Sequence, residues 1–269
     1  MDAWVAAHAW AAYLAIGAVV GFAAGLLGIG GGMVMVPLLV FVLGAEGLGP
    51  NVLHIALATA MATILFTSVS SVRAHHGLGS VDWPIVRAMA PGTIAGAFVA
   101  ALLAGLIPTR PLAVMFTALV FGAASQMLLD LRPKGTRPFP SRASLFGVAA
   151  AIGATSSLLS AGGAFLSIPF LAWCGVPLRR AIGSAAAIGF PIALAGTAGH
   201  VVQGLTAEGL PPWTLGFVYL PALGLVALTS MATAPLGARL THRVPVRRLR
   251  LIFAFILYVM AARMVAGFW

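Results

Sequence analysis

Charged residues are scarce in this chain of 269 residues. Asp, Glu, Lys and Arg together make up 7% of the sequence, whereas a soluble globular domain carries roughly 25%. Hydrophobic residues make up 61%, and the mean hydropathy is +1.06. So little charge cannot solvate a water-soluble fold. The composition therefore predicts an all-α integral membrane protein, whose first partner is the lipid bilayer.

Carboxylates are the rarest charged groups, and all of them fall in predicted loops or at segment ends. They are Asp2, Glu46, Asp82, Asp130 and Glu208. We therefore expect no carboxylate at the membrane centre to relay protons or bind sodium. The sequence also lacks an intramembrane acid pair, a metal-ligand cluster and a cysteine–histidine dyad. We expect no enzyme activity, no metal and no cofactor.

The sequence also has a single cysteine and lacks the features of a cleavable signal peptide. Cys174 is the only cysteine, so no disulfide can form within the chain, and a small buried apolar residue is expected there. The first ten residues lack the basic region of a cleavable signal peptide. We therefore expect the first apolar stretch to remain in the mature protein.

Basic residues, in contrast, are in excess and give a formal net charge of +10. A nucleic-acid-binding protein would gather them on one exposed face. Here they lie in short gaps between apolar runs. This distribution is typical of cytoplasmic loops, which keep Lys and Arg inside during membrane insertion. We therefore expect no nucleic-acid partner.

Ten apolar segments follow one another along the chain. Two of them are short, with eleven positions each, which correspond to about 16 Å of helix or half a membrane; they cover 33–43 and 164–174. The other eight are long enough to span a bilayer and cover 9–27, 53–73, 84–106, 111–129, 143–159, 180–203, 212–235 and 248–267.

The two halves of the chain resemble each other. A linker rich in proline and charge, residues 130–142, separates a first repeat (1–129) from a second (143–269). At an offset of 132 Gly30, Gly31 and Pro37 match Gly162, Gly163 and Pro169, and at an offset of 125 Thr59 and His75 match Ser184 and His200. Ordered matches of this kind predict an internal repeat.

An odd number of segments per repeat predicts that the second repeat is inverted in the membrane. Of the fifteen basic residues, thirteen then fall on one side and only Arg110 and Arg263 on the other. The crowded side is assigned to the cytoplasm, and both termini to the outside. Whether residues 9–43 cross twice or form a re-entrant hairpin stays open, because both leave later loops on the same sides.

The glycine-rich breaks before the two short segments are the predicted substrate site. Discontinuous helices often hold substrate near the midplane of transporters, and the free N–H groups after each break favour an anion. The candidate ligands are Gly30, Gly31, Gly32, Ser160, Gly162 and Gly163, with Thr59 and Ser184 on the following segments. Close helix packing is the alternative role for glycine, and it is preferred for Gly17, Gly21 and Gly25.

Two histidines occupy equivalent positions in the repeats. His75 and His200 are predicted near opposite ends of their segments. An interfacial role is the common one at such positions, and proton handling is the functional alternative.

The two break motifs resemble the paired signatures of a known transporter family. The stretches GFAAGLLGIGGGMVMVPLL and GATSSLLSAGGAFLSIPFL are similar to those of the sulfite exporter TauE/SafE family. The resemblance covers nearly the whole chain, and implies transport of sulfite or small organosulfur anions across a bacterial inner membrane. In the second motif Ser160 and Ala164 stand where the first has Gly28 and Gly32, so the two breaks need not contribute equally.

Three functions are therefore considered. The first is export of a small sulfur-containing anion by rocking of the two repeats. The second is a permease for uptake of sulfonates or carboxylates, and the third is a channel-like accessory membrane component. The sequence leaves the anion, the coupling ion and the oligomeric state open.

Overall fold

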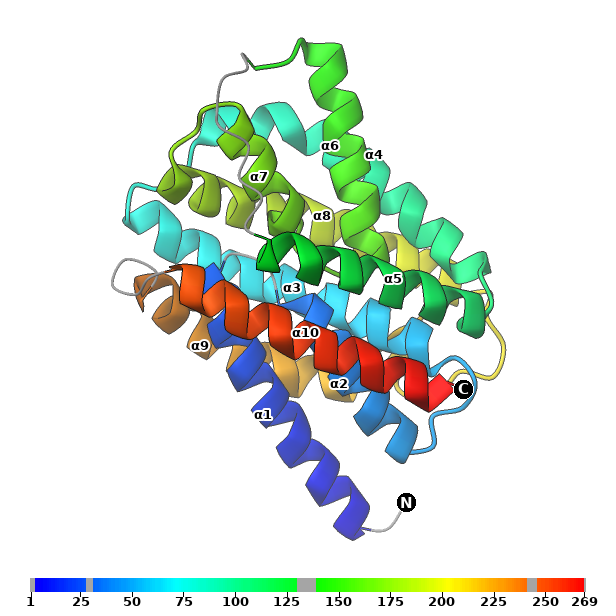
Figure 1. Ribbon diagram of the computed structural model, residues 1–269. Coiled ribbons are helices and arrows are strands. Elements are labelled where there is room, and N and C mark those ends of the chain that lie inside the picture. Colours follow the sequence, from blue (N-terminus) through cyan, green and yellow to red (C-terminus); the bar gives the residue numbers. More distant parts are fainter. Residues whose placement is uncertain (1–2, 28–30, 130–138, 241–245, 269) are drawn as a thin grey trace.

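The computed structural model consists of helices and one short β-hairpin. It describes the backbone of residues 3–27, 31–129, 139–240 and 246–268, and the side chains of these residues except 3–7, 27, 246–250 and 265–268. In chain order the elements are α1 (Ala3–Leu27), α2 (Gly32–Ala45), α3 (Val52–Gly77), α4 (Trp83–Leu106), α5 (Thr109–Leu128), α6 (Arg142–Leu158), α7 (Ala164–Trp173), α8 (Leu178–Gly204), β1 (Thr214–Leu215), β2 (Val218–Tyr219), α9 (Leu220–Leu240) and α10 (Val246–Phe268) (Figure 1).

Each predicted apolar segment corresponds to one helix, and the largest difference concerns the segment at 212–235. Residues 214–215 pair with residues 218–219 in an antiparallel hairpin, and α9 begins only at Leu220. Gly216 stands first in the two-residue turn, with a positive φ of 56°, which suits a tight hairpin. The prediction of a helix from residue 212 was wrong because the hairpin is as apolar as a membrane segment.

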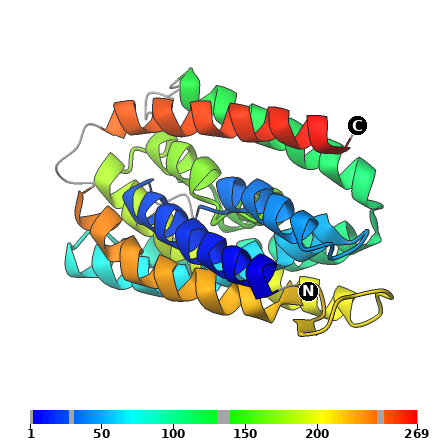
Figure 2. The ribbon, with the colours of Figure 1, turned by 90° about the horizontal axis from the view of Figure 1, so that it is seen from below.

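Helices α3 and α8 form the centre of the molecule. They pack against each other and are the most buried of the long apolar helices. Helix α9 packs on α3 and helix α4 packs on α8, while α1 runs along α9 and α6 runs along α4 (Figure 1). Helices α5 and α10 lie side by side and form a further layer next to α2 and α7 (Figure 2).

Three glycines allow α1 to approach α9 closely. A Cβ atom on Gly17, Gly21 or Gly25 would collide with backbone atoms of α9 between residues 226 and 234. This is the close approach that small residues permit between membrane helices. The prediction that these glycines serve helix packing is confirmed.

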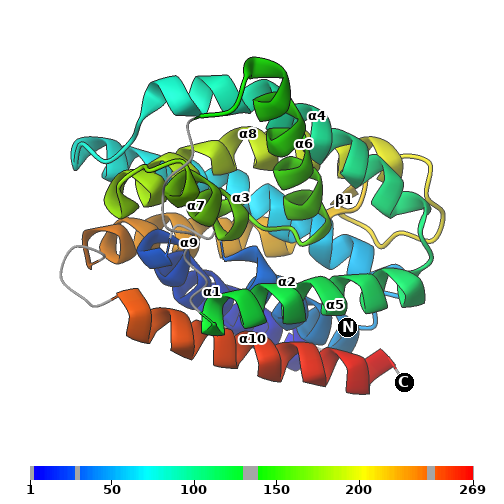
Figure 3. The same cartoon turned by 45° about the horizontal axis from the view of Figure 1, so that its top comes forward.

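The lengths and hydropathy of the helices are those of a multi-pass membrane protein. Within the described residues, α1, α3, α4, α5, α8 and α9 are long and apolar enough to cross a membrane. Helices α2 and α7 have 14 and 10 residues, which correspond to roughly 21 and 15 Å. The prediction of two short helices is therefore confirmed. The two termini lie at the same end of the molecule (Figures 2 and 3).

Candidate substrate site

Each of the two short helices begins directly after a glycine in the left-handed conformation. Gly31 precedes α2 with φ 70° and ψ −10°, and Gly163 precedes α7 with φ 77° and ψ −10°. Residues with a side chain rarely adopt this conformation, so glycine is needed at both positions. Neither glycine offers a side-chain cap. Gly30 lies outside the described residues.

The two breaks meet in the middle of the protein. A Cβ atom on Gly32 would collide with the carbonyl oxygen of Ser160. The Ser160 hydroxyl donates a hydrogen bond of 2.8 Å to the carbonyl of Leu57 in α3. The carbonyl oxygen of Gly162 lies 3.1 Å from the position that a Cβ of Gly189 in α8 would take. The breaks therefore rest against the central pair of helices, α3 and α8.

Three buried serine hydroxyls beside the second break have no hydrogen-bond partner in the described part of the chain. They belong to Ser156 and Ser157 at the end of α6 and to Ser167 in α7. The Ser156 Oγ lies 3.1 Å from the position of a Cβ on Gly163, and the Ser157 Oγ lies 3.0 Å from that of a Cβ on Gly196. A buried hydroxyl group without a hydrogen-bond partner lowers the stability of the fold, so a ligand that pairs with it is favoured.

Backbone donors accompany these hydroxyls. At the start of α7 the amides of Leu166 and Ser167 bond to the carbonyl of Gly163. No hydrogen bond to a described residue satisfies the amides of Ala164 and Phe165. The first turn of a helix leaves such N–H groups free for an anion. The second break thus combines free hydroxyl and amide donors with an apolar surrounding, which can bind a small oxyanion.

Thr59 and Ser184, in contrast, use their hydroxyls within the fold. The Thr59 Oγ1 accepts a hydrogen bond of 3.0 Å from the N–H of Tyr219, the residue before α9. The Ser184 Oγ accepts one of 2.9 Å from the N–H of Asp82, the residue before α4. Each therefore ties a central helix to the start of an outer helix, and the structure does not bring either hydroxyl together with the unpaired serines.

The two predicted histidines are both buried but have different surroundings. Beside His75, the Ser80 hydroxyl donates to the His75 carbonyl at 2.9 Å and lies 3.4 Å from the ring Nδ1. Both ring nitrogens of His200 lack a partner among the described residues, although only 1% of its surface is exposed.

A third histidine, which the sequence did not single out, lies near His200. The His54 Nε2 donates to the carbonyl of Ile107 at 3.0 Å, and its ring stacks on Phe217 with the centroids 5.2 Å apart. Its Nδ1 has no partner among the described residues. His54 lies on α3 and His200 on α8, the two packed central helices, near enough for a charge on one ring to disfavour a charge on the other. No sequence signal pointed to His54, because its counterpart in the repeat is Arg179.

One carboxylate is more buried than its loop position predicted. Glu46 follows α2, is half-buried, and has a buried Oε2 atom. Burial raises the pKa of this carboxyl, and the nearby Tyr13 hydroxyl opposes the shift. Among the described residues, no group of three or more His, Cys, Asp or Glu side chains could hold a metal ion.

Known proteins resemble this chain over almost its whole length. Residues 13–264 match the family model described as sulfite exporter TauE/SafE. A protein of Haemophilus influenzae, named probable membrane transporter protein, is 36% identical over 254 residues, which cover 93% of this chain and 96% of that protein. A protein of Methanocaldococcus jannaschii with a similar name is 26% identical over 257 residues, which cover 91% of each chain.

Proposed function

Because this chain belongs to the sulfite exporter TauE/SafE family of membrane transporters, we propose that it exports a small sulfur-containing anion from a bacterial cytoplasm across the inner membrane. Sulfite and small organosulfonates are the substrates considered. The observation that carries the proposal is the meeting of two glycine breaks beside three buried serine hydroxyls that have no partner in the described part of the chain.

The proposed ligands are hydrogen-bond donors without a fixed positive charge. Ser156, Ser157 and Ser167 supply hydroxyls, and Ala164 and Phe165 supply amides at a helix N-terminus. The partial positive charge of the helix end favours an oxyanion. A site of this kind holds an anion weakly enough to release it on the other side. Gly31, Gly32 and Gly163 serve mainly to bring the two breaks together.

The proposed transport cycle uses two inverted repeats, helices α1 to α5 and α6 to α10. The packing of the helices supports this arrangement, since α1 packs on α9 just as α6 packs on α4, and α3 packs on α8. Both repeats contain a left-handed glycine before a short helix with an internal proline. Rocking of one repeat against the other would expose the breaks to each side in turn.

A basic cavity supports entry of the anion from the cytoplasm. It has a volume of about 500 Å³ between the ends of α3 and α9, and Arg73 and Arg239 line it together with Ser70 and Met231. The excess of Arg and Lys at this end supports a cytoplasmic orientation for it. Two guanidinium groups there would raise the local concentration of anions.

Uptake coupled to protons is the second candidate, and the buried histidines favour it. Both ring nitrogens of His200 lack a partner among the described residues, and His54 lies near it. Burial opposes a charged imidazole, so proton uptake at His200 would require water or the transported anion to pair with the ring. His75 is the third candidate for proton handling. Dependence of flux on these three side chains would favour uptake over export.

The test is anion binding and counterflow with the purified chain in proteoliposomes. Ser156→Ala and Ser157→Ala should each weaken binding of the transported anion about fivefold, if each removes one hydrogen bond of about 1 kcal/mol. Ser71→Ala is the matched control, because this buried hydroxyl of α3 also lacks a partner among the described residues. Unchanged binding in both variants would refute the site, and flux without counterflow would indicate a channel.

A further inference from the structure

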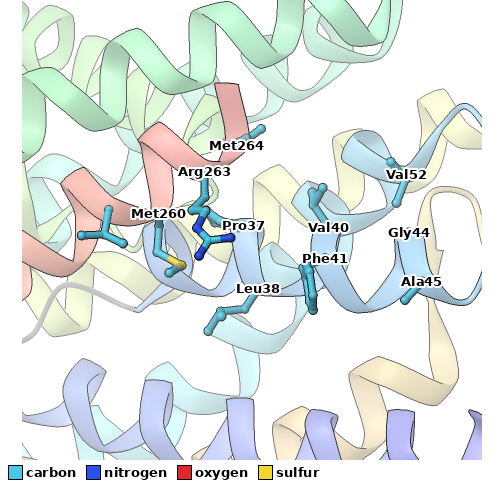
Figure 4. A pocket seen from close by; sticks show the side chains of 11 residues that line it. Pro37, Leu38, Val40, Phe41, Gly44, Ala45, Val52, Met260, Arg263 and Met264 are labelled. Carbon is cyan, nitrogen blue, oxygen red and sulfur yellow. The ribbon is translucent and has the colours of Figure 1, made fainter. Parts of the chain in front are cut away.

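A groove lies between α2 and α10, away from the candidate substrate site. Its volume is about 690 Å³, within the usual range of roughly 300–1,000 Å³ for ligand pockets. Side chains such as Leu38 and Phe41 of α2 and Val259 and Met260 of α10 line it (Figure 4). Arg263 is the only charged residue among the described lining residues, and its side chain extends from α10 toward α2 (Figure 4).

Exposed apolar side chains flank the open side of the groove. Ile252, Ile256, Val259 and Arg263 are exposed and follow one another at intervals of three or four residues, so they form one stripe on α10. Across the groove Phe41 is 79% exposed. An exposed apolar stripe on a membrane-spanning helix contacts lipid, and a ligand therefore enters this groove from the lipid phase.

Arg263 lies at the depth of lipid headgroups. It is five residues from the end of α10 at Phe268, which corresponds to about 8 Å. The end of α2 at Ala45 and the start of α3 at Val52 line the same groove, so the guanidinium is near one end of the bundle. A long arginine side chain reaches from such a position to the interface.

We propose that this groove binds an anionic phospholipid, with one acyl chain between α2 and α10 and the phosphate paired with Arg263. Among the described residues no carboxylate lines the groove, so none of them gives the guanidinium a counter-ion there. Guanidinium and phosphate form a bidentate pair. The apolar walls accept an acyl chain, whereas a small hydrophilic anion would leave them unfilled.

The bound lipid would influence transport through α2. This helix begins at the Gly31 break and packs on α10. A lipid held between the two helices would limit the movement of α2 relative to α10. The lipid site itself does not depend on the identity of the transported anion.

The test is retention of phosphatidylglycerol by the full chain in detergent, measured by native mass spectrometry and thermal unfolding. Arg263→Gln should reduce phosphatidylglycerol binding about fivefold, since one basic residue near a membrane surface contributes about 1 kcal/mol. Arg263→Lys should retain part of the affinity. Phosphatidylcholine, whose choline offsets the charge of its phosphate, should lose less affinity in Arg263→Gln than phosphatidylglycerol does. Arg110→Gln is the control, because Arg110 is exposed at the start of α5 near the same end but does not line the groove.

A second variant tests the apolar groove independently of the charge of Arg263. Val259→Trp fills the groove and keeps Arg263, and it should also lower phosphatidylglycerol retention. Equal retention by Arg263→Gln or Val259→Trp and the wild type would overturn the proposal. A second result would also overturn it: sulfite stabilises the lipid-free wild type but not Arg263→Gln. The groove would then bind the soluble anion. If Arg263→Gln is less stable to the same extent with and without lipid, Arg263 only stabilises the end of α10, and the proposal is wrong.

Discussion

At the scale of single residues, the buried hydroxyls divide into two groups. Thr59 and Ser184 accept hydrogen bonds from backbone amides at the starts of α9 and α4. The serines beside the second break, in contrast, find no partner among the residues that the structure describes. The repeat in the sequence identified the first group, since Thr59 and Ser184 match each other. It could not show which way a hydroxyl points, because the partners lie 160 and 102 residues away.

Thr59→Val should reduce stability and leave anion binding unchanged. The substitution keeps the shape but leaves the Tyr219 N–H without an acceptor, which costs about 1–3 kcal/mol. Thr63→Val is the control one turn further along α3, where the hydroxyl donates only to the Thr59 carbonyl and its loss should cost little. Thermal unfolding in detergent measures both. A loss of anion affinity in Thr59→Val at unchanged stability would instead make Thr59 a ligand.

Glu46→Gln should change how stability depends on pH. Burial raises the pKa of Glu46 in the folded protein above its ordinary value of 4.5. The carboxyl therefore contributes stability that is fully present below pH 4.5 and is lost as the pH rises through the folded-state pKa. Glutamine removes this dependence, so the variant should be the more stable protein at neutral pH. Parallel unfolding profiles of the two proteins from pH 4.5 to 8 would contradict the assignment.

At the scale of secondary-structure elements, hydropathy and glycine spacing predicted the ten helices and the two short ones among them. They failed at residues 212–219, where the hairpin precedes α9. Apolar composition predicts burial in the bilayer but does not distinguish a helix from a covered hairpin. Gly216 marks the turn of the hairpin, but the chain contains 32 glycines, so a single glycine is a weak signal.

Gly216→Ala should destabilise the protein strongly. A Cβ there would collide with backbone atoms of Val201 in α8, and the φ of Gly216 is positive. Gly224→Ala in α9 is the matched control, because no atom lies within 4 Å of its Cβ position. It should leave stability unchanged or raise it by up to about 1 kcal/mol. Equal melting temperatures for the two variants would show that the hairpin contributes little.

At the scale of the whole molecule, the proposed export can be driven by the membrane potential. Moving one negative charge outward through 100 mV of an inside-negative potential releases about 2.3 kcal/mol. No carboxylate is found in the interior of the described spanning helices, which agrees with export that needs no coupling ion. The sequence predicted this distribution of carboxylates, but it could not predict the cavity of Arg73 and Arg239, which joins the ends of two helices distant in the chain.

Anion flux in oriented proteoliposomes should therefore follow an imposed potassium diffusion potential toward the positive side, without a proton or sodium gradient. Arg73→Gln and Arg239→Gln should raise the KM from the cytoplasmic side and leave the maximal rate unchanged. Labelling of Glu208→Cys in a Cys174→Ala background verifies the orientation of the vesicles. Strict dependence of flux on a proton gradient would contradict uniport and favour His54 and His200 as proton carriers.

The pairing of α1 with α9 has a consequence for the order in which the protein is made. The first helix emerges from the ribosome long before its partner, which begins only at Leu220. Until then the face of α1 that carries Gly17, Gly21 and Gly25 lacks α9, its main partner in the folded protein. Each half of the nascent chain can insert by itself, since its helices satisfy their own backbone. The final packing waits for the last third of translation, and a truncated product would keep an uncovered glycine ridge that quality-control proteases can reach.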